Sequence, residues 1–247
     1  MDAIGGQELS MPVVHPAEIW RATGRYDAPA PGPALLRFKD RTGHDMVLAM
    51  THEESVTDLA KSEISSYRQL PLLVYQIQTK YRDEPRPRGG LIRVREFIMQ
   101  DGYRFQADFA SLDAYYPSVY QAYLNIFSRC GVASIPVEAD SGIMGGSGSH
   151  EFMVASEAGE DTLIVCPQCH YAANAEAAGF VKGQGVPGAD LPLEKVATPG
   201  TTTIEQVANL LGVQTNQTLK AVFYSTPQGK VVFAVIRGDL DVNPTKL

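Results

Sequence analysis

Two strand-like runs on either side of a basic loop constrain the fold more than any other feature of the sequence. Residues 72–82 and 95–105 are rich in the β-branched and aromatic residues that favour strands. The segment between them is rich in proline, glycine and arginine, which favours a loop. Two strands joined by one loop pair antiparallel most simply. We therefore expect a long β-hairpin in a mostly antiparallel sheet.

The neighbouring segments predict an α+β fold. Apolar residues alternate on both sides of a turn within residues 35–50, which indicates a second hairpin. Thr51 is a suitable N-cap for a helix that ends before Pro71. We expect the antiparallel sheet to be flanked by helices packed on one face. The remaining elements expected here are a helix at 112–130 and short strands at 135–139, 152–155 and 162–165.

Composition changes near Gly179 and suggests a domain boundary. Residues 179–202 are rich in glycine and proline, as in a linker. We therefore expect a first domain at 1–178 and the start of a second at 203–247. The second contains a predicted helix at 203–211 and a hairpin, which together are too little to enclose a core. The expected hairpin strands cover residues 219–225 and 231–237.

Bulk composition excludes several classes of protein. Hydrophobic residues make up 44% and charged residues 20% of the 247 residues, which is ordinary globular composition. No apolar run approaches a membrane span, and the N-terminus lacks a secretory signal, so we expect a cytoplasmic protein without a membrane partner. A net charge of −7 argues against coating nucleic acid, and no DNA partner is expected.

The loop between the two long strands carries the main chemical signal. Five arginines lie within the fourteen residues 82–95, and guanidinium groups bind triphosphate oxygens in fixed geometry. Phe97 and Glu84 have the aromatic face and the acceptor that an adenine requires. The alternative is a solvated basic loop with structural ion pairs, and composition alone does not decide between them.

The segment Tyr81-Arg82-Asp83-Glu84, the basic loop and Arg95-Glu96-Phe97 resemble motif 2 of class II aminoacyl-tRNA synthetases. Several further segments resemble the bacterial prolyl-tRNA synthetases, and the resemblance extends over essentially the whole chain. These segments are residues 47–54, 67–71, 76–80, 145–152 and 171–174.

The resemblance implies a set of ATP-binding residues. Arg82 would contact the α-phosphate and the proline carboxylate and would be the catalytic residue. Glu84 would accept from the adenine amino group, Phe97 would stack on the ring, and Arg93 would reach the distal phosphates. Val94 belongs to the same implied set. ATP with Mg²⁺ is the implied cofactor.

The same resemblance implies a proline pocket. Thr51 and Glu53 would meet the imino nitrogen, a role compatible with Thr51 as a helix cap. Met99, Asp101 and Tyr103 alternate on a predicted strand and so share one face. That face would line the pocket together with Arg82, and ordinary sheet packing is the alternative.

Two motifs suggest other chemistry. Residues 142–148 contain four glycines but lack the Lys-Ser/Thr of a phosphate-binding loop, so we expect a structural turn. Cys166-Pro167-Gln168-Cys169-His170 spells a haem-attachment motif, which requires an export route that the chain lacks. Cys166 and Cys169 supply only half of a usual zinc site, so zinc is not expected.

The C-terminal segment resembles the start of the editing insertion of these enzymes. Lys220 would contact the 3′ end of the tRNA during hydrolysis of mischarged alanyl-tRNA. The alternative is an ordinary surface lysine. The other implied partners are L-proline, tRNA(Pro) and a second copy of the chain in a homodimer.

The resemblance implies a proline–tRNA ligase with post-transfer editing. It begins at the end of motif 1 and stops inside the insertion, so we expect the 247 residues alone to be inactive. A non-catalytic module derived from a synthetase is a second interpretation. A third is another class II ligase, such as the threonyl or seryl enzyme, against which Thr51-His52-Glu53 and the editing-like insertion argue.

Overall fold

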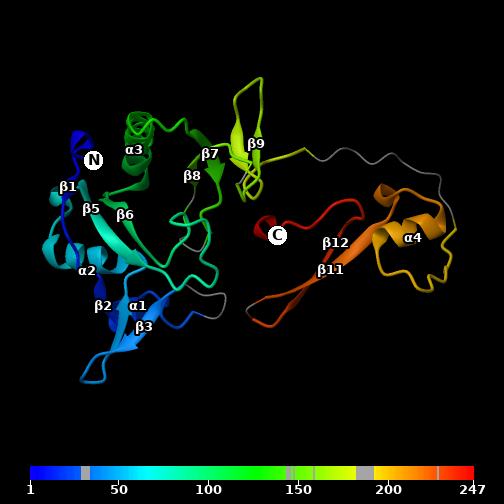
Figure 1. Ribbon diagram of the computed structural model, residues 1–247, viewed down its shortest axis with the longest axis horizontal. Coiled ribbons are helices and arrows are strands. Elements are labelled where there is room, and N and C mark those ends of the chain that lie inside the picture. Colours follow the sequence, from blue (N-terminus) through cyan, green and yellow to red (C-terminus); the bar gives the residue numbers. More distant parts are fainter. Residues whose placement is uncertain (29–33, 143–145, 147, 158, 182–191, 227) are drawn as a thin grey trace. The chain divides into compact units, whose positions relative to one another are not determined.

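The computed structural model describes residues 1–28, 34–142, 146, 148–157, 159–181, 192–226 and 228–247. Within them the chain forms two compact units, Met1–Gly131 and Val132–Leu247 (Figure 1). The expected boundary between residues 178 and 203 stays a prediction, and residues 182–191 of the expected linker lie outside the described residues. No helix in the described part of the chain is long and apolar enough to cross a bilayer.

The first unit is built around the expected long hairpin. Strand β5 (Leu72–Tyr81) pairs antiparallel with β6 (Glu96–Phe105) along its full length, and β1 (Gln7–Glu8) adds to β5 in parallel. Inside the basic loop, Arg88 and Arg93 bridge across a tight turn. Gly89 and Gly90 occupy this turn with φ of +69° and +64°, which side-chain-bearing residues adopt at a cost.

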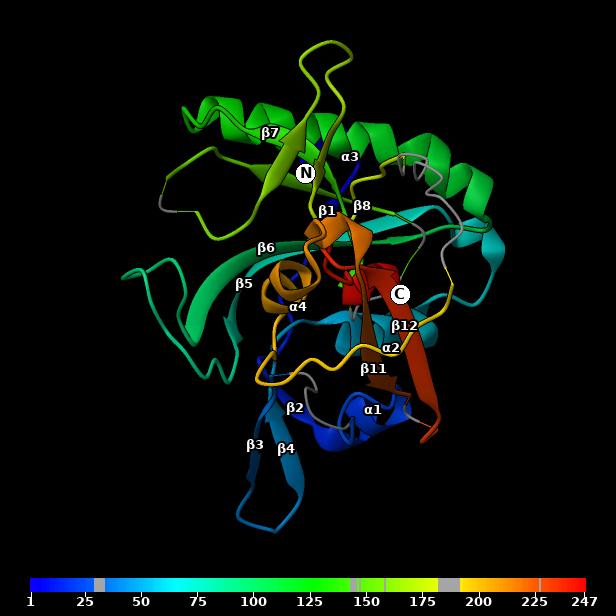
Figure 2. The same cartoon turned by 90° about the vertical axis from the view of Figure 1, so that its right-hand side faces the viewer.

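Helices lie on both sides of this hairpin (Figures 1 and 2). Helix α3 (Phe109–Arg129) contacts one face through Tyr123, whose hydroxyl lies 3.2 Å from Gln100. The start of α2 (Glu53–Glu63) contacts the other face, where His52 N donates to the Tyr103 hydroxyl. The expectation that helices pack on one face is therefore wrong, because alternate residues of β6 offer polar partners on both faces.

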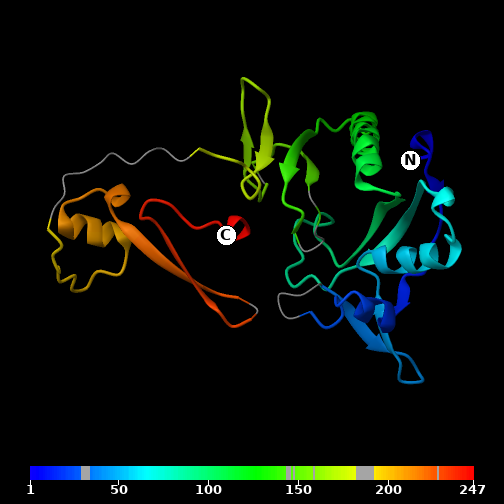
Figure 3. The ribbon, with the colours of Figure 1, turned by 180° about the vertical axis from the view of Figure 1, so that it is seen from behind.

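A small core supports the second sheet of this unit. Strand β4 (Asp45–Leu48) lies between β2 (Val14–Pro16) and β3 (Leu36–Lys39), which confirms the hairpin expected within residues 35–50. Its turn projects from the unit (Figure 3). Helix α1 (Ala17–Ala22) places Trp20 against Val47 and Met50 in a buried cluster. This packing fixes the segment that leads from β4 into α2.

Two helix termini differ from expectation. The N-cap of α2 is His52 rather than Thr51, and no side chain caps it, because the Thr51 hydroxyl donates to Glu53 instead. Helix α3 begins three residues before the predicted start, since the Asp108 carboxylate accepts from Ser111 N at 2.7 Å. Pro117 consequently lies inside the helix.

The second unit contains a four-stranded sheet in the order β8-β7-β10-β9. Its members are β7 (Ile135–Ala139), β8 (Ser149–Met153), β9 (Leu163–Val165) and β10 (Ala172–Asn174). Strand β8 begins three residues before its predicted start, and β10 was not predicted. The glycine-rich segment expected as a turn includes residues 143–145 and 147, which lie outside the described residues.

The C-terminal part of this unit matches the predicted helix and hairpin. Helix α4 (Ile204–Leu211) begins at a Thr203 cap, and β11 (Leu219–Ser225) pairs with β12 (Val231–Arg237). Short 3-10 turns cover Asp2–Ile4, Tyr67–Gln69, Thr215–Gln217 and Pro244–Lys246. Phe223 and Phe233 face each other on the hairpin with 68% and 59% of their surface exposed. The hairpin therefore buries little of its apolar face against the described residues.

Candidate active site on the β5–β6 hairpin

The hairpin register gathers several of the predicted site residues on one face. Gln76 lies opposite Asp101, and Lys80 lies opposite Phe97. Directly opposed residues of an antiparallel pair have their side chains on the same face of the sheet. Along each strand, every second side chain also lies on that face. Strand residues sharing this face are Val74, Gln76, Gln78, Lys80, Phe97, Met99, Asp101 and Tyr103. Arg82 continues the alternation one residue past β5, with its backbone N bonded to Arg95 O.

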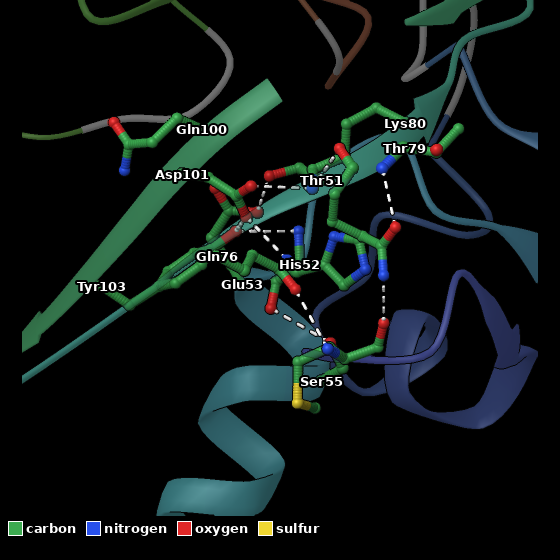
Figure 4. Close-up of polar contacts among 12 residues, drawn as sticks. Thr51, His52, Glu53, Ser55, Gln76, Thr79, Lys80, Gln100, Asp101 and Tyr103 are labelled. Carbon is green, nitrogen blue, oxygen red and sulfur yellow. Dashed lines mark hydrogen bonds and ion pairs between the residues drawn. The ribbon is translucent and has the colours of Figure 1, made fainter. Parts of the chain in front are cut away.

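A buried polar cluster occupies the middle of this face (Figure 4). The Lys80 ammonium lies 2.7 Å from Asp101 Oδ1, and the Lys80 side chain is fully buried. Gln76 Nε2 donates to Asp101 Oδ2 at 3.0 Å, and the Tyr103 hydroxyl donates to the same oxygen. The side-chain oxygen Oε1 of Gln76 in turn accepts from Met11 N at 3.1 Å. Asp101 is therefore engaged by protein groups on both oxygens.

The predicted imino-binding pair lies beside this cluster. Thr51 is buried, and its hydroxyl donates to Glu53 Oε2 at 2.5 Å. His52 N donates to the Tyr103 hydroxyl at 3.1 Å, which connects the start of α2 to β6. Burial raises the pKa of Tyr103, and the Asp101 and Glu53 carboxylates raise it further, so the phenol stays protonated. The pair thus presents a hydroxyl and a carboxylate from a fixed backbone.

Arg82 follows directly after β5, where its backbone N donates to Arg95 O at 2.8 Å. Its guanidinium carbon lies 5.1 Å from the centre of the Phe97 ring, which is cation–π distance. Burial lowers the pKa of Arg82, while the charges of Glu53 and Glu84 oppose that shift. Its Nε is buried and has no hydrogen-bond partner among the described residues. A half-buried cation with an unused donor is suited to an anionic ligand.

Glu84 and Arg93, both predicted to bind ATP, contact each other. Arg93 Nε lies 2.8 Å from Glu84 Oε2, and Arg95 Nε donates to the Glu84 carbonyl at 3.0 Å. The bond from Arg93 holds the pKa of Glu84 below its usual range, and backbone donation from Arg86 adds to this. Val94, which follows Arg93 in the sequence, is half-buried. The ion-pair alternative raised from composition therefore describes one real feature of the loop.

A second charged group lies at the start of α2. Arg25 Nη1 lies 2.9 Å from Glu54 Oε1 and 3.6 Å from Glu53 Oε2. The Glu54 side chain is only 1% exposed. Arg25 thereby fixes two consecutive carboxylates, one of which belongs to the predicted proline pocket.

The remaining predicted residues lie in the second unit. Lys220 on β11 forms an ion pair with Asp241 at 2.6 Å. Cys166 and Cys169 are free thiols in a turn before β10, where Cys166 N donates to Tyr171 O. Within the described residues no three His, Cys, Asp or Glu side chains are grouped so as to hold a metal ion.

Sequence reasoning assigned no role to Gln76, Lys80, His52 or Arg25. Gln76 and Lys80 have the same parity as Arg82 along the strand, so period-two alternation could have placed them on the same face. His52 lies within the recognised Thr-His-Glu segment. No sequence signal pointed to Arg25, which reaches α2 through tertiary packing.

Comparisons with known families agree with this geometry. The family described as "tRNA synthetase class II core domain (G, H, P, S and T)" matches residues 36–220. The family described as "Aminoacyl-tRNA editing domain" matches residues 198–247.

Individual relatives support the same assignment. A Dehalococcoides mccartyi protein named Proline--tRNA ligase is 56% identical over 247 residues, which make up 100% of this chain and 43% of that protein. A Salinispora tropica protein of the same name is 52% identical over 255 residues, covering 100% of this chain and 42% of the relative. The chain thus spans less than half the length of these curated relatives.

A solved structure shares the fold. Giardia lamblia prolyl-tRNA synthetase in complex with prolyl-adenylate matches 56% of this chain and 34% of that chain, with a TM-score of 0.50 at 19% identity. The α+β prediction and the resemblance to prolyl-tRNA synthetases are both confirmed. Because the core family matches well over half of its residues, the chain belongs to the class II tRNA synthetase core family.

Proposed function

We propose that this chain is part of a proline–tRNA ligase that activates L-proline with ATP and transfers it to tRNA(Pro). The observation that carries the proposal is the single hairpin face that holds Arg82, Phe97 and Tyr103 beside Thr51 and Glu53. The names of the curated relatives, which are similar over the whole length of this chain, support the choice of proline.

The first step joins proline to the nucleotide. A proline carboxylate oxygen attacks the α-phosphorus of ATP, the bond to the β-phosphate bridging oxygen breaks, and pyrophosphate leaves. No protein nucleophile is needed, because the substrate carboxylate fills that role. Arg82 would neutralise charge that develops between the carboxylate and the phosphate. Its buried Nε, which has no partner within the described part of the chain, supports this role.

The other residues of the face would select and orient the substrates. Thr51 and Glu53 would bind the imino nitrogen, with Met99, Asp101 and Tyr103 forming the pocket wall. Phe97 would stack on adenine, and Glu84 would accept from its amino group, next to Arg93 and Val94. Mg²⁺ that accompanies ATP would neutralise phosphate charge.

In the second step a hydroxyl at the 3′ end of the tRNA attacks the proline carbonyl and releases AMP. The segment that matches the editing family would hydrolyse alanyl-tRNA(Pro), with Lys220 at the tRNA 3′ end. A cytoplasmic homodimer is the proposed working form.

The test is ATP–pyrophosphate exchange with a protein of the relatives' full length that contains these residues. Proline should support exchange, whereas threonine and serine should not. Exchange that responds to threonine or serine in place of proline would assign the chain to another class II ligase. No exchange with any amino acid would favour a non-catalytic module.

A further inference from the structure

Lys80 has no place in the proposed chemistry, yet it is among the most enclosed side chains of the first unit. Its side chain has 0% exposure, and its ammonium lies 2.7 Å from Asp101 Oδ1 and 3.5 Å from Gln78 O. A buried ion pair adds little stability over a well-packed apolar pair, because both charges lose their hydration. Stability alone therefore does not explain why Lys80 and Asp101 form a buried ion pair.

Asp101 transmits the position of this ammonium to Tyr103. One carboxylate oxygen faces Lys80, and the other accepts from Gln76 and from the Tyr103 hydroxyl. The ion pair at one oxygen and the hydrogen bonds at the other restrict the orientation of the carboxylate. The Tyr103 hydroxyl consequently points its proton at β6 and leaves its oxygen free to accept.

That oxygen accepts from the start of α2. His52 N donates to it at 3.1 Å (Figure 4). Thr51 and Glu53 flank His52 and hydrogen-bond to each other. A continuous series of contacts thus runs from Lys80 through Asp101 and Tyr103 to the residues proposed to bind the imino group.

We propose that Lys80 is a positioning residue that holds the amino-acid subsite in place through Asp101 and Tyr103. The inference rests on the proposed function, since that function defines the subsite. Lys80 cannot touch a substrate from its enclosed position, so it acts only through its partners. The residues proposed to bind adenine, Glu84 and Phe97, are not members of this series.

The variant Lys80→Met removes the ammonium and keeps a similar side-chain length. Asp101 then loses the group that fixes one of its oxygens, and Tyr103 loses a fixed acceptor. The KM for proline in pyrophosphate exchange should rise roughly tenfold or more, with the KM for ATP little changed. Tyr103→Phe breaks the next link while leaving the Lys80–Asp101 pair intact, and it should show the same selective rise.

A double-mutant cycle distinguishes positioning from general loss of structure. If both residues act through one series of contacts, K80M/Y103F should raise the KM for proline no further than either single change. Gln100→Met is the matched control, because Gln100 neighbours Asp101 on β6 but contacts Tyr123 on the opposite face. It should leave the KM for proline unchanged.

Several results would overturn the inference. The first is that the effects of K80M and Y103F on the KM for proline are additive, and the second is that the KM for proline and the KM for ATP rise equally. The third is an unaltered KM for proline in Y103F. This last result can be measured even if K80M fails to fold. An unsubstituted protein with no proline-dependent exchange would instead overturn the proposed function, and this inference with it.

Discussion

The indole N–H of Trp20 donates to His15 Nδ1 at 3.2 Å in the core of the first unit. This bond leaves the proton of His15 on Nε2, which donates to Pro12 O at 2.8 Å. His52 Nε2 lies 3.0 Å from the same carbonyl, and the two imidazole rings meet edge to face at 5.0 Å. Two neutral histidines therefore hydrogen-bond to the carbonyl oxygen of Pro12, next to the start of α2.

This arrangement predicts acid sensitivity of the first unit. The pKa of His52 is lowered from 6.5 to about 4, first by burial and then by the nearby charge of Lys80. Burial also lowers the pKa of His15. Below pH 6.5 the unfolded chain binds protons that the folded chain excludes, so stability is lost as the pH falls toward 4. The decrease in the free energy of unfolding assigned to His52 is about 3 kcal/mol at most.

Trp20 is the single tryptophan of the chain and is fully buried, so its fluorescence reports this unit alone. Urea midpoints measured by Trp20 emission should fall steadily as the pH is lowered from 6.5 to 4. The His52→Gln variant should show a weaker dependence of the midpoint on pH. A midpoint that does not change over this range would contradict the neutral-histidine description.

A second prediction concerns Lys220 and the editing reaction. Lys220→Ala in the full-length protein should weaken hydrolysis of alanyl-tRNA(Pro) while leaving proline-dependent exchange intact, because the two sites lie in different units. Deacylation and exchange assays on the same preparation measure both. Equal loss of the two activities would mean that Lys220 is structural.

Asp241→Asn is the matched control for Lys220. The Asp241 side chain is 97% exposed, so its ion pair with Lys220 should contribute under about 1 kcal/mol to stability. This variant should preserve deacylation. A loss as large as that of Lys220→Ala would instead assign the effect to the ion pair.

The third prediction concerns the two thiols of the Cys-x-x-Cys turn. Backbone donation from Cys169, together with that from Gln168 and the Cys169 side chain, lowers the pKa of the Cys166 thiol. Iodoacetamide at neutral pH should therefore label Cys166 roughly threefold or more faster than Cys130, although Cys130 is exposed. Peptide mass spectrometry quantifies both sites in one sample. Faster labelling of Cys130 would contradict the geometry of the turn.

The alternation and turn patterns of the sequence predicted both long strands, the β3–β4 hairpin and the β11–β12 hairpin. They also predicted that Met99, Asp101 and Tyr103 share a face, because this depends only on strand period. Local pattern could not predict β10, a three-residue strand that pairs in parallel with β7 far from it in sequence.

The polar interior of the site was also beyond local pattern. Lys80 and Gln76 are charged or polar residues in a strand, and nothing local indicates that both are fully buried. The partners of both side chains lie elsewhere in the sequence, since Gln76 accepts from Met11 N and Lys80 pairs with Asp101. The roles of Arg82, Glu84 and Phe97 came from family resemblance and remain proposals.

The most direct test of the account is the effect of Arg82→Ala on proline-dependent ATP–pyrophosphate exchange in the full-length protein. Loss of a half-buried guanidinium that neutralises charge in the transition state should reduce transition-state stabilisation by about 3 kcal/mol or more. This corresponds to a reduction in kcat/KM of at least roughly a hundredfold. Circular dichroism should confirm that the variant is folded. Near-normal exchange by a folded Arg82→Ala protein would contradict the assignment of the β5–β6 face as the site of proline activation.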